Sequence, residues 1–121
     1  MVRYIVAASV LASLLVGPAA IAARSPTLSE REAITRTLPA FFRNAPVECL
    51  WVEIRLSKNP RYALADPAPL NWRKPGSRCL RYASNGFYVL RKTTRWKIIY
   101  EGSDPPPCSM RIPRDLVRCL R

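Results

Sequence analysis

The chain contains no histidine, so it lacks the side chain that most often transfers protons near neutral pH. Catalytic triads of the Ser-His-Asp type and Cys-His pairs are therefore excluded. Only four glycines occur, and they are scattered, so the sequence encodes no glycine-rich phosphate loop and no dinucleotide fingerprint. No asparagine lies in an Asn-x-Ser/Thr site. From these absences we expect no cofactor, no metal and no histidine-based enzyme chemistry.

Long apolar runs are also scarce, and the clearest one is at the N-terminus. Residues 4–16 carry no charge, Arg3 precedes them, and small residues that include Ala20-Ile21-Ala22 follow. This order is typical of a secretory signal peptide, and the run is shorter than the roughly 20 residues that span a bilayer. We expect a signal peptide over residues 1–22, a single domain over residues 23–121, secretion to the extracellular space and no transmembrane anchor.

Four cysteines remain in the expected mature chain: Cys49, Cys79, Cys108 and Cys119. In an oxidising compartment they pair by default, and each bridge stabilises a small domain by roughly 2–4 kcal/mol. A zinc site is the alternative, but the chain has no Cys-x-x-Cys pair and no histidine. The sequence therefore predicts two disulfides, for which three connectivities exist.

Acidic residues are few compared with basic ones. Without Arg3 the chain keeps 19 basic residues (20 − 1) and 8 acidic ones, a net charge of +11. Such a balance favours an anionic polymer or a cell-envelope surface as partner, and a secreted protein is the other candidate. The alternative is that these side chains merely face water, as in many basic secreted proteins.

Residues 26–44 show a helical pattern. Two pairs have the spacing of a capping box, Thr27 with Glu30 and Ser29 with Glu32, so either Thr27 or Ser29 can begin the helix. Pro39 is expected to kink the helix or divide it into two. An apolar stripe follows at helical spacing: Ile34, Leu38, Phe41 and Phe42. The stripe predicts that one side of this region packs on a core.

Residues 47–57 alternate strictly, with Leu50, Val52, Ile54 and Leu56 on one side, and predict a half-buried strand. Residues 58–77 hold four prolines and a glycine, which favours a long irregular loop. Loops of this length are often functional, so a protein-binding or inhibitory role for residues 58–77 is one alternative function.

The rest of the chain predicts a meander and a closing helix. Residues 79–82 are expected to pair with residues 87–92 through the turn Asn85-Gly86, and a second turn leads to a strand over residues 95–101. Pro113 suits the first position of a short C-terminal helix. The predicted class is α+β, with an N-terminal helix, an antiparallel three- to four-stranded sheet and a short C-terminal helix.

This order also favours one disulfide connectivity. If the strand at residues 47–57 runs antiparallel to residues 87–92, Cys49 and Cys79 reach the same end of the sheet. Cys49–Cys79 is then the favoured bridge, and Cys108–Cys119 remains to tie the closing helix to the prolines before it. The other two connectivities stay open.

One cluster of cations suggests a binding site. Four of them crowd the predicted hairpin and form a possible patch for an anionic ligand: Arg91, Lys92, Arg95 and Lys97. Aromatic residues between them, Trp96 included, would let such a groove stack single-stranded nucleic acid. Trp96 also fits the buried phase of its strand, so core packing is the competing role.

Carboxylates provide a further alternative. Glu53, Glu101 and Asp104 are candidates for the acid and base of a small hydrolase. Each also has a plain structural role on a strand surface or beside a turn. We therefore expect a non-enzymatic binding module, with the carboxylate-dependent hydrolase as the alternative.

Several segments resemble a known group of proteins. They are residues 52–57, residues 60–63, the hairpin from Val89 to Lys92 with Trp96 to Ser103, and the ending Cys108-Ser109 with Ile112-Pro113. In these segments the chain resembles small, uncharacterised secreted proteins of actinobacteria. The resemblance implies an exported α+β domain and transfers no catalytic or binding residue.

Overall fold

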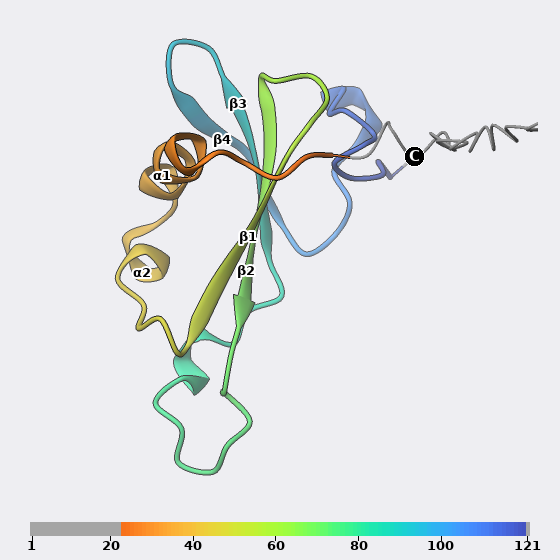
Figure 1. The fold of residues 1–121 in the computed structure, drawn as a ribbon. Helices are drawn as coiled ribbons and strands as arrows, with labels where there is room; N and C mark the ends of the chain where they lie inside the picture. Colours follow the sequence, from red (N-terminus) through yellow and green to blue (C-terminus); the bar gives the residue numbers. More distant parts are fainter. Residues whose placement is uncertain (1–22, 121) are drawn as a thin grey trace, which may run out of the picture.

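The computed structural model describes residues 23–120 as one four-stranded antiparallel sheet with helices on one face (Figure 1). Each strand lies beside the strand that precedes it in the chain. The strands are β1 (Leu50–Leu56), β2 (Tyr62–Pro69), β3 (Phe87–Lys92) and β4 (Trp96–Gly102). The expected α+β class is confirmed, whereas the expected signal peptide, residues 1–22, lies outside the described residues.

The predicted helical region forms two short helices, α1 (Leu28–Thr37) and α2 (Ala40–Arg43), separated by Pro39. The capping box is present: the Thr27 hydroxyl accepts a hydrogen bond from the Glu30 backbone N–H at 3.2 Å. The Glu30 carboxylate accepts one from the Thr27 backbone N–H at 3.0 Å. These bonds satisfy backbone donors that the first helical turn leaves free.

The main core lies between α1 and the sheet. Ile34 of α1 and Leu38, the residue that caps its C-terminus, are buried against the inward side of every strand. The predicted alternation of β1 is confirmed, because its even-numbered residues are buried and its odd-numbered residues are exposed. The sheet contributes Leu50, Val52, Ile54, Leu56, Ala63, Ala65, Leu90 and Trp96.

The expectation of one irregular loop over residues 58–77 was wrong, since its middle forms β2. Two prolines made this stretch look irregular, yet neither disrupts the sheet. The β1–β2 hydrogen bonds use the even-numbered residues of β2, so Pro67 and Pro69 turn their nitrogens away from β1. On the other side, β3 pairs only with Tyr62–Ala65. No strand therefore lies beside Pro67 or Pro69 to accept the hydrogen bond that a proline nitrogen cannot donate.

The expected pairing of residues 79–82 with β3 was also wrong. Leu80–Tyr82 forms a 3-10 turn, and β3 pairs with β2 and β4 instead. Cys79 is bonded to Cys49, immediately before β1, which holds this segment at the end of the sheet. The second expected hairpin is confirmed, because β3 and β4 pair across a turn at residues 93–95.

The expected C-terminal helix is absent from the described residues 113–120. A turn closes where the Leu116 N–H donates to the Pro113 carbonyl, and the chain then becomes extended. Leu120 lies beside Pro107 in a parallel bridge, and its N–H donates to the Pro106 carbonyl. This pairing with the proline segment competes with helix formation, because it uses backbone groups that a helix would need.

The C-terminal segment covers the sheet face opposite the helices (Figure 1). Leu64 and Val89 point away from the α1 side and are nevertheless buried, as are Ile112 and Leu116. Asp115 anchors this cover: its carboxylate accepts hydrogen bonds from the Ser57 hydroxyl at 2.7 Å and from the Lys58 backbone N–H at 2.6 Å.

Both favoured disulfides, Cys49–Cys79 and Cys108–Cys119, are present, and each joins Cα atoms 4.8 Å apart. The pairing of β1 with β3, from which the first bridge was predicted, was wrong, because β2 lies between these two strands. Within residues 23–120, no helix has both the length and the apolar character needed to cross a bilayer.

Candidate cationic surface

The sheet divides the cations that the sequence grouped on the hairpin. All four are exposed: Arg91, Lys92, Arg95 and Lys97. Arg91 and Lys97 lie opposite each other on the face away from α1, where the Arg91 guanidinium is 5.7 Å from the Tyr62 ring centroid. Lys92 lies on the α1 face, with its ammonium 6.0 Å from the Trp96 ring centroid. The expected patch is therefore divided into two groups of cations, Arg91 with Lys97 on one face of the sheet and Lys92 with Arg95 on the α1 side.

A hollow of about 500 Å³ separates the hairpin tip from the last turn of α1. Lys92, Arg95 and Arg36 bring positive charge to its wall. Trp96 also lines it but is only 6% exposed, because its ring belongs to the main core. The remaining lining residues are Ala33, Thr37 and Thr94.

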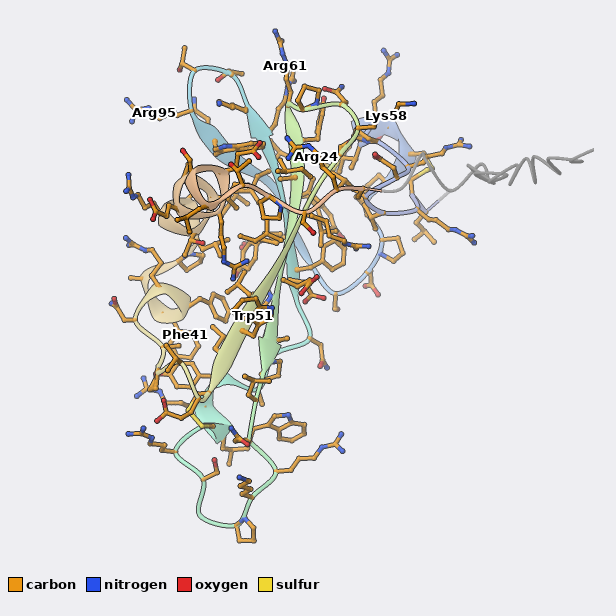
Figure 2. The ribbon with its side chains drawn as sticks, in the orientation of Figure 1. Arg24, Phe41, Trp51, Lys58, Arg61 and Arg95 are labelled. Atoms are coloured by element: carbon orange, nitrogen blue, oxygen red, sulfur yellow. A yellow bond between two sulfur atoms is a disulfide. The ribbon has the colours of Figure 1, made fainter. Side chains whose placement is uncertain are left out.

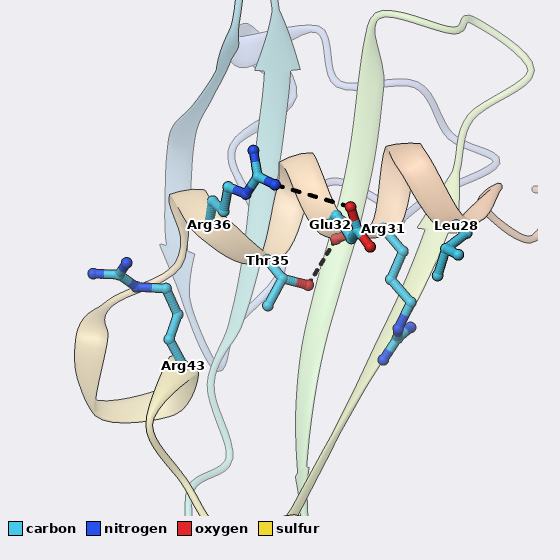
Figure 3. Close-up of a pocket in the computed structure, with 6 residues that line it drawn as sticks. All are labelled: Leu28, Arg31, Glu32, Thr35, Arg36 and Arg43. Atoms are coloured by element: carbon cyan, nitrogen blue, oxygen red, sulfur yellow. Dashed lines mark hydrogen bonds and ion pairs between the residues drawn. The ribbon is translucent and has the colours of Figure 1, made fainter.

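A second hollow, of about 400 Å³, lies on the outer side of α1 (Figure 3). Arg31, Arg36 and Arg43 line it together with Leu28, Glu32 and Thr35. Arg31 is fixed, because its Nη2 donates to the Val52 carbonyl at 2.7 Å and its guanidinium lies 4.3 Å from the Trp51 ring centroid. That contact also occupies part of the free edge of β1.

Arg36 lines both hollows and joins them into one surface. We call this the cationic surface, made of Arg31, Arg36, Arg43, Lys92 and Arg95. Among its described lining residues the one carboxylate is Glu32, which lies 3.9 Å from Arg36. Five positive charges therefore face one negative charge, which suits an anionic ligand.

The helical half of this surface was not predicted from the sequence. Arg31, Arg36 and Arg43 are at least 48 positions before Arg91 (91 − 43), so no local cluster reveals them. For Arg36 and Arg43 the available signal was their position on the polar side of the predicted helical region, away from Ile34 and Leu38. Arg31 falls beside the apolar stripe, three residues before Ile34 and seven before Leu38, so the helical pattern gave no such signal for it. The antiparallel sheet brings the hairpin tip to the end of α1, and that proximity is a tertiary effect.

Charged groups outside this surface form two further salt bridges. A salt bridge and hydrogen bonds from Arg24, together with the Thr27 backbone N–H, lower the pKa of Glu30 to about 2. Glu48 pairs with Arg78 near the first disulfide. Burial and the nearby charge of Glu101 raise the pKa of Tyr88, which lines neither hollow of the cationic surface.

The three candidate catalytic carboxylates do not form one site. Glu53 is on β1 and Glu101 is on β4, which are the two edge strands. Three strand spacings separate them by about 14 Å, which is wider than the roughly 5–9.5 Å between paired carboxylates in glycosidases. Asp104 follows β4, and its carbonyl accepts a hydrogen bond from the Tyr100 hydroxyl. Neither hollow is lined by any of the three.

Over residues 23–120, no group of three or more potential metal ligands comes together. Comparison of the chain with protein-family models, curated proteins and solved structures gave no match. The resemblance to secreted actinobacterial proteins therefore stays an expectation, and functional inference depends on the cationic surface.

Proposed function

We propose that the protein is an exported, non-enzymatic module that binds an anionic polymer of the cell envelope or its surroundings. The observation that carries this proposal is the cationic surface, where five cations face a single carboxylate. Arg43, Lys92 and Arg95 make no side-chain hydrogen bond or ion pair to any part of the described chain. Their charges are therefore available to a ligand.

Binding of this kind releases counterions from the polymer, so affinity should fall steeply with salt. We would measure the affinity for long-chain polyphosphate from low to high NaCl. Removing three contacting cations should lower the slope of log K against log[salt] by about 2, at about 0.7 for each charge on a flexible polyanion.

The decisive variant is Arg36→Gln/Lys92→Gln/Arg95→Gln, which removes three charges from the cationic surface. Its matched control is Lys74→Gln/Arg114→Gln/Arg118→Gln, which removes three exposed charges elsewhere. We expect the first triple variant to lose most of the affinity and the control to keep it. No retention of the unaltered protein on polyphosphate at low salt would overturn the proposed function.

Export is part of the proposal and has its own support. Two disulfides join all four cysteines, as is usual for proteins that mature in an oxidising compartment. Mass spectrometry of the protein recovered from culture medium should find Ala23 at the N-terminus and no titratable thiol. An intact chain in the cytosol with four free thiols would contradict export.

A further inference from the structure

The arrangement of charge within the cationic surface indicates which kind of polymer it accommodates. We infer that the ligand is a linear phosphate polymer without nucleobases, which crosses α1 at Arg36 and occupies both hollows. This inference rests on the proposed function and specifies the ligand class and its path.

The directions of the guanidinium groups favour an extended ligand. In Figure 3, Arg31, Arg36 and Arg43 point apart and do not converge on one position. Arg31 and Arg36 are five residues apart on α1, about 7.5 Å along the helix axis. One small anion cannot contact all three groups, whereas a chain of regularly spaced charges can meet them in turn.

Arg36 gives such a chain a continuous path. It lines the hollow beside Arg43 and the hollow beside Arg95, so the two hollows share one wall. The Arg36 side chain is 78% exposed, and its nearest carboxylate, Glu32, is 3.9 Å away, so this contact is a weak surface ion pair. A ligand can therefore engage Arg36 without disrupting the fold.

The lining residues disfavour nucleic acid. Proteins that bind single strands stack bases on exposed aromatic rings. Among the described lining residues the one aromatic is Trp96, which is 6% exposed with Lys92 over its ring. Trp51 is 53% exposed beside Arg31, but the Arg31 guanidinium covers one face of its ring and Trp51 lines neither hollow. The two hollows thus offer charge without a free stacking platform, which fits a polymer that has no bases.

The arrangement of the cations along the ligand path favours phosphate over carboxylate. Four of the five cations are arginines, whose planar fork binds an oxyanion through two hydrogen bonds. A carboxylate presents two oxygens in one plane, whereas a phosphate presents oxygens in several directions. Successive phosphates of one chain can therefore face cations on different sides of the ligand path, whereas each carboxylate turns both of its oxygens to one side.

The test compares four probes on the full-length mature protein: orthophosphate, long-chain polyphosphate, oligo-dT and poly-glutamate, the last three matched in total charge. We expect long polyphosphate to bind most tightly and orthophosphate to fail to compete at equal phosphate concentration. Tighter or equal binding of oligo-dT would overturn the absence of a base site. Equal binding of poly-glutamate would overturn the phosphate assignment.

The path across α1 is tested with Arg36→Gln and Arg36→Lys, with Arg118→Gln as the exposed control. Arg36→Gln should weaken polyphosphate binding about tenfold, as expected for losing one charge-assisted contact, and Arg36→Lys should restore only part of the loss. An effect of Arg36→Gln no larger than that of Arg118→Gln would overturn the path. The proposed function would survive that result, because it fails only if the unaltered protein does not bind polyanions.

Discussion

On the α1 side of the sheet the cover is a capped helix, whereas on the opposite side it is the irregular segment of residues 103–120. The helix brings Ile34 and Leu38 into the main core without a covalent link. The irregular cover is closed by Cys108–Cys119 and fixed to the sheet by Asp115, which accepts hydrogen bonds from Ser57 and Lys58. Figure 2 shows Lys58 beside the C-terminal segment. Both faces bury apolar side chains, but by different means.

This difference shows where the disulfides are needed. A helix satisfies its own backbone hydrogen bonds, so packing alone can hold it on a sheet. An irregular segment gains less from local structure and still loses conformational entropy when it is ordered. Both bridges lie where regular structure is sparse: one beside the 3-10 turn at Leu80–Tyr82 and one in the C-terminal cover.

The largest expected effect tests the packed side. Ile34→Ala should destabilise the protein by about 4 kcal/mol, because the side chain is fully buried and α1 cannot collapse into the cavity. Leu116→Ala on the opposite side should cost less, about 2–3 kcal/mol, because an irregular segment relaxes more easily. Urea unfolding measures both free energies. Equal losses would contradict the proposed difference between the two covers.

The two disulfides should differ in how much they stabilise the protein, because the one that closes the longer loop removes more entropy from the unfolded chain. Removing Cys49–Cys79, with a separation of 30 residues, should cost about 3.6 kcal/mol by the chain-entropy relation. Removing Cys108–Cys119, with a separation of 11, should cost about 2.8 kcal/mol. Paired Cys→Ala variants are compared by urea unfolding.

Amide hydrogen exchange then shows which part of the protein is destabilised when Cys108–Cys119 is removed. Loss of Cys108–Cys119 should expose amides of residues 106–120 and leave those of α1 protected. Faster exchange in α1 than in the C-terminal segment would show that the two covers are not independent.

The helices and three of the four strands could be predicted, because their local pattern and their tertiary environment agree. β1 alternates strictly and is buried on its even side, and the box at Thr27 and Glu30 starts α1 where expected. β2 could not be predicted from the sequence. A proline has no backbone N–H, and this disrupts a sheet only where a neighbouring strand would accept the missing hydrogen bond. That depends on where β3 begins, which residues 58–77 do not encode.

The same limit applies to the candidate site. The hairpin cations were visible as a local cluster, and Lys92 and Arg95 do belong to the cationic surface. The sequence could not show that the sheet separates Arg91 and Lys97 from them, because that follows from strand register. Nor could it place Arg36 beside the hairpin tip, since that contact is made through the packing of α1.

A smaller effect is expected from the anchor of the irregular cover. Asp115→Asn removes the charge that accepts hydrogen bonds from Ser57 and Lys58 and should cost about 1.5–2 kcal/mol. The control is Asp104→Asn, an exposed carboxylate whose side chain makes no hydrogen bond to the described chain. Thermal unfolding compares the two variants. A loss for Asp115→Asn no greater than the control would mean that the disulfide alone holds this cover.

The smallest expected effect is acid sensitivity at the start of α1, where Arg24 and Thr27 hold the pKa of Glu30 near 2 in the folded protein, below its ordinary value of 4.5. Because the folded pKa is the lower one, the stabilisation is complete above about pH 5. It is lost as the pH falls from about 4.5 to 2. Glu30 is partly exposed, so the loss should stay below about 1 kcal/mol.

Glu30→Gln should remove the part of the unfolding free energy that depends on the ionised Glu30. The difference in stability between the unaltered protein and this variant should therefore be largest at neutral pH and should shrink in acid. Urea unfolding at pH 6, 4 and 2.5 measures that difference. If it stayed constant across the three values, the Arg24–Glu30 pair would contribute nothing to the helical cover. The α1 side would then depend on Ile34 and Leu38 alone, which would widen the contrast with the hydrogen-bonded Asp115 on the other face.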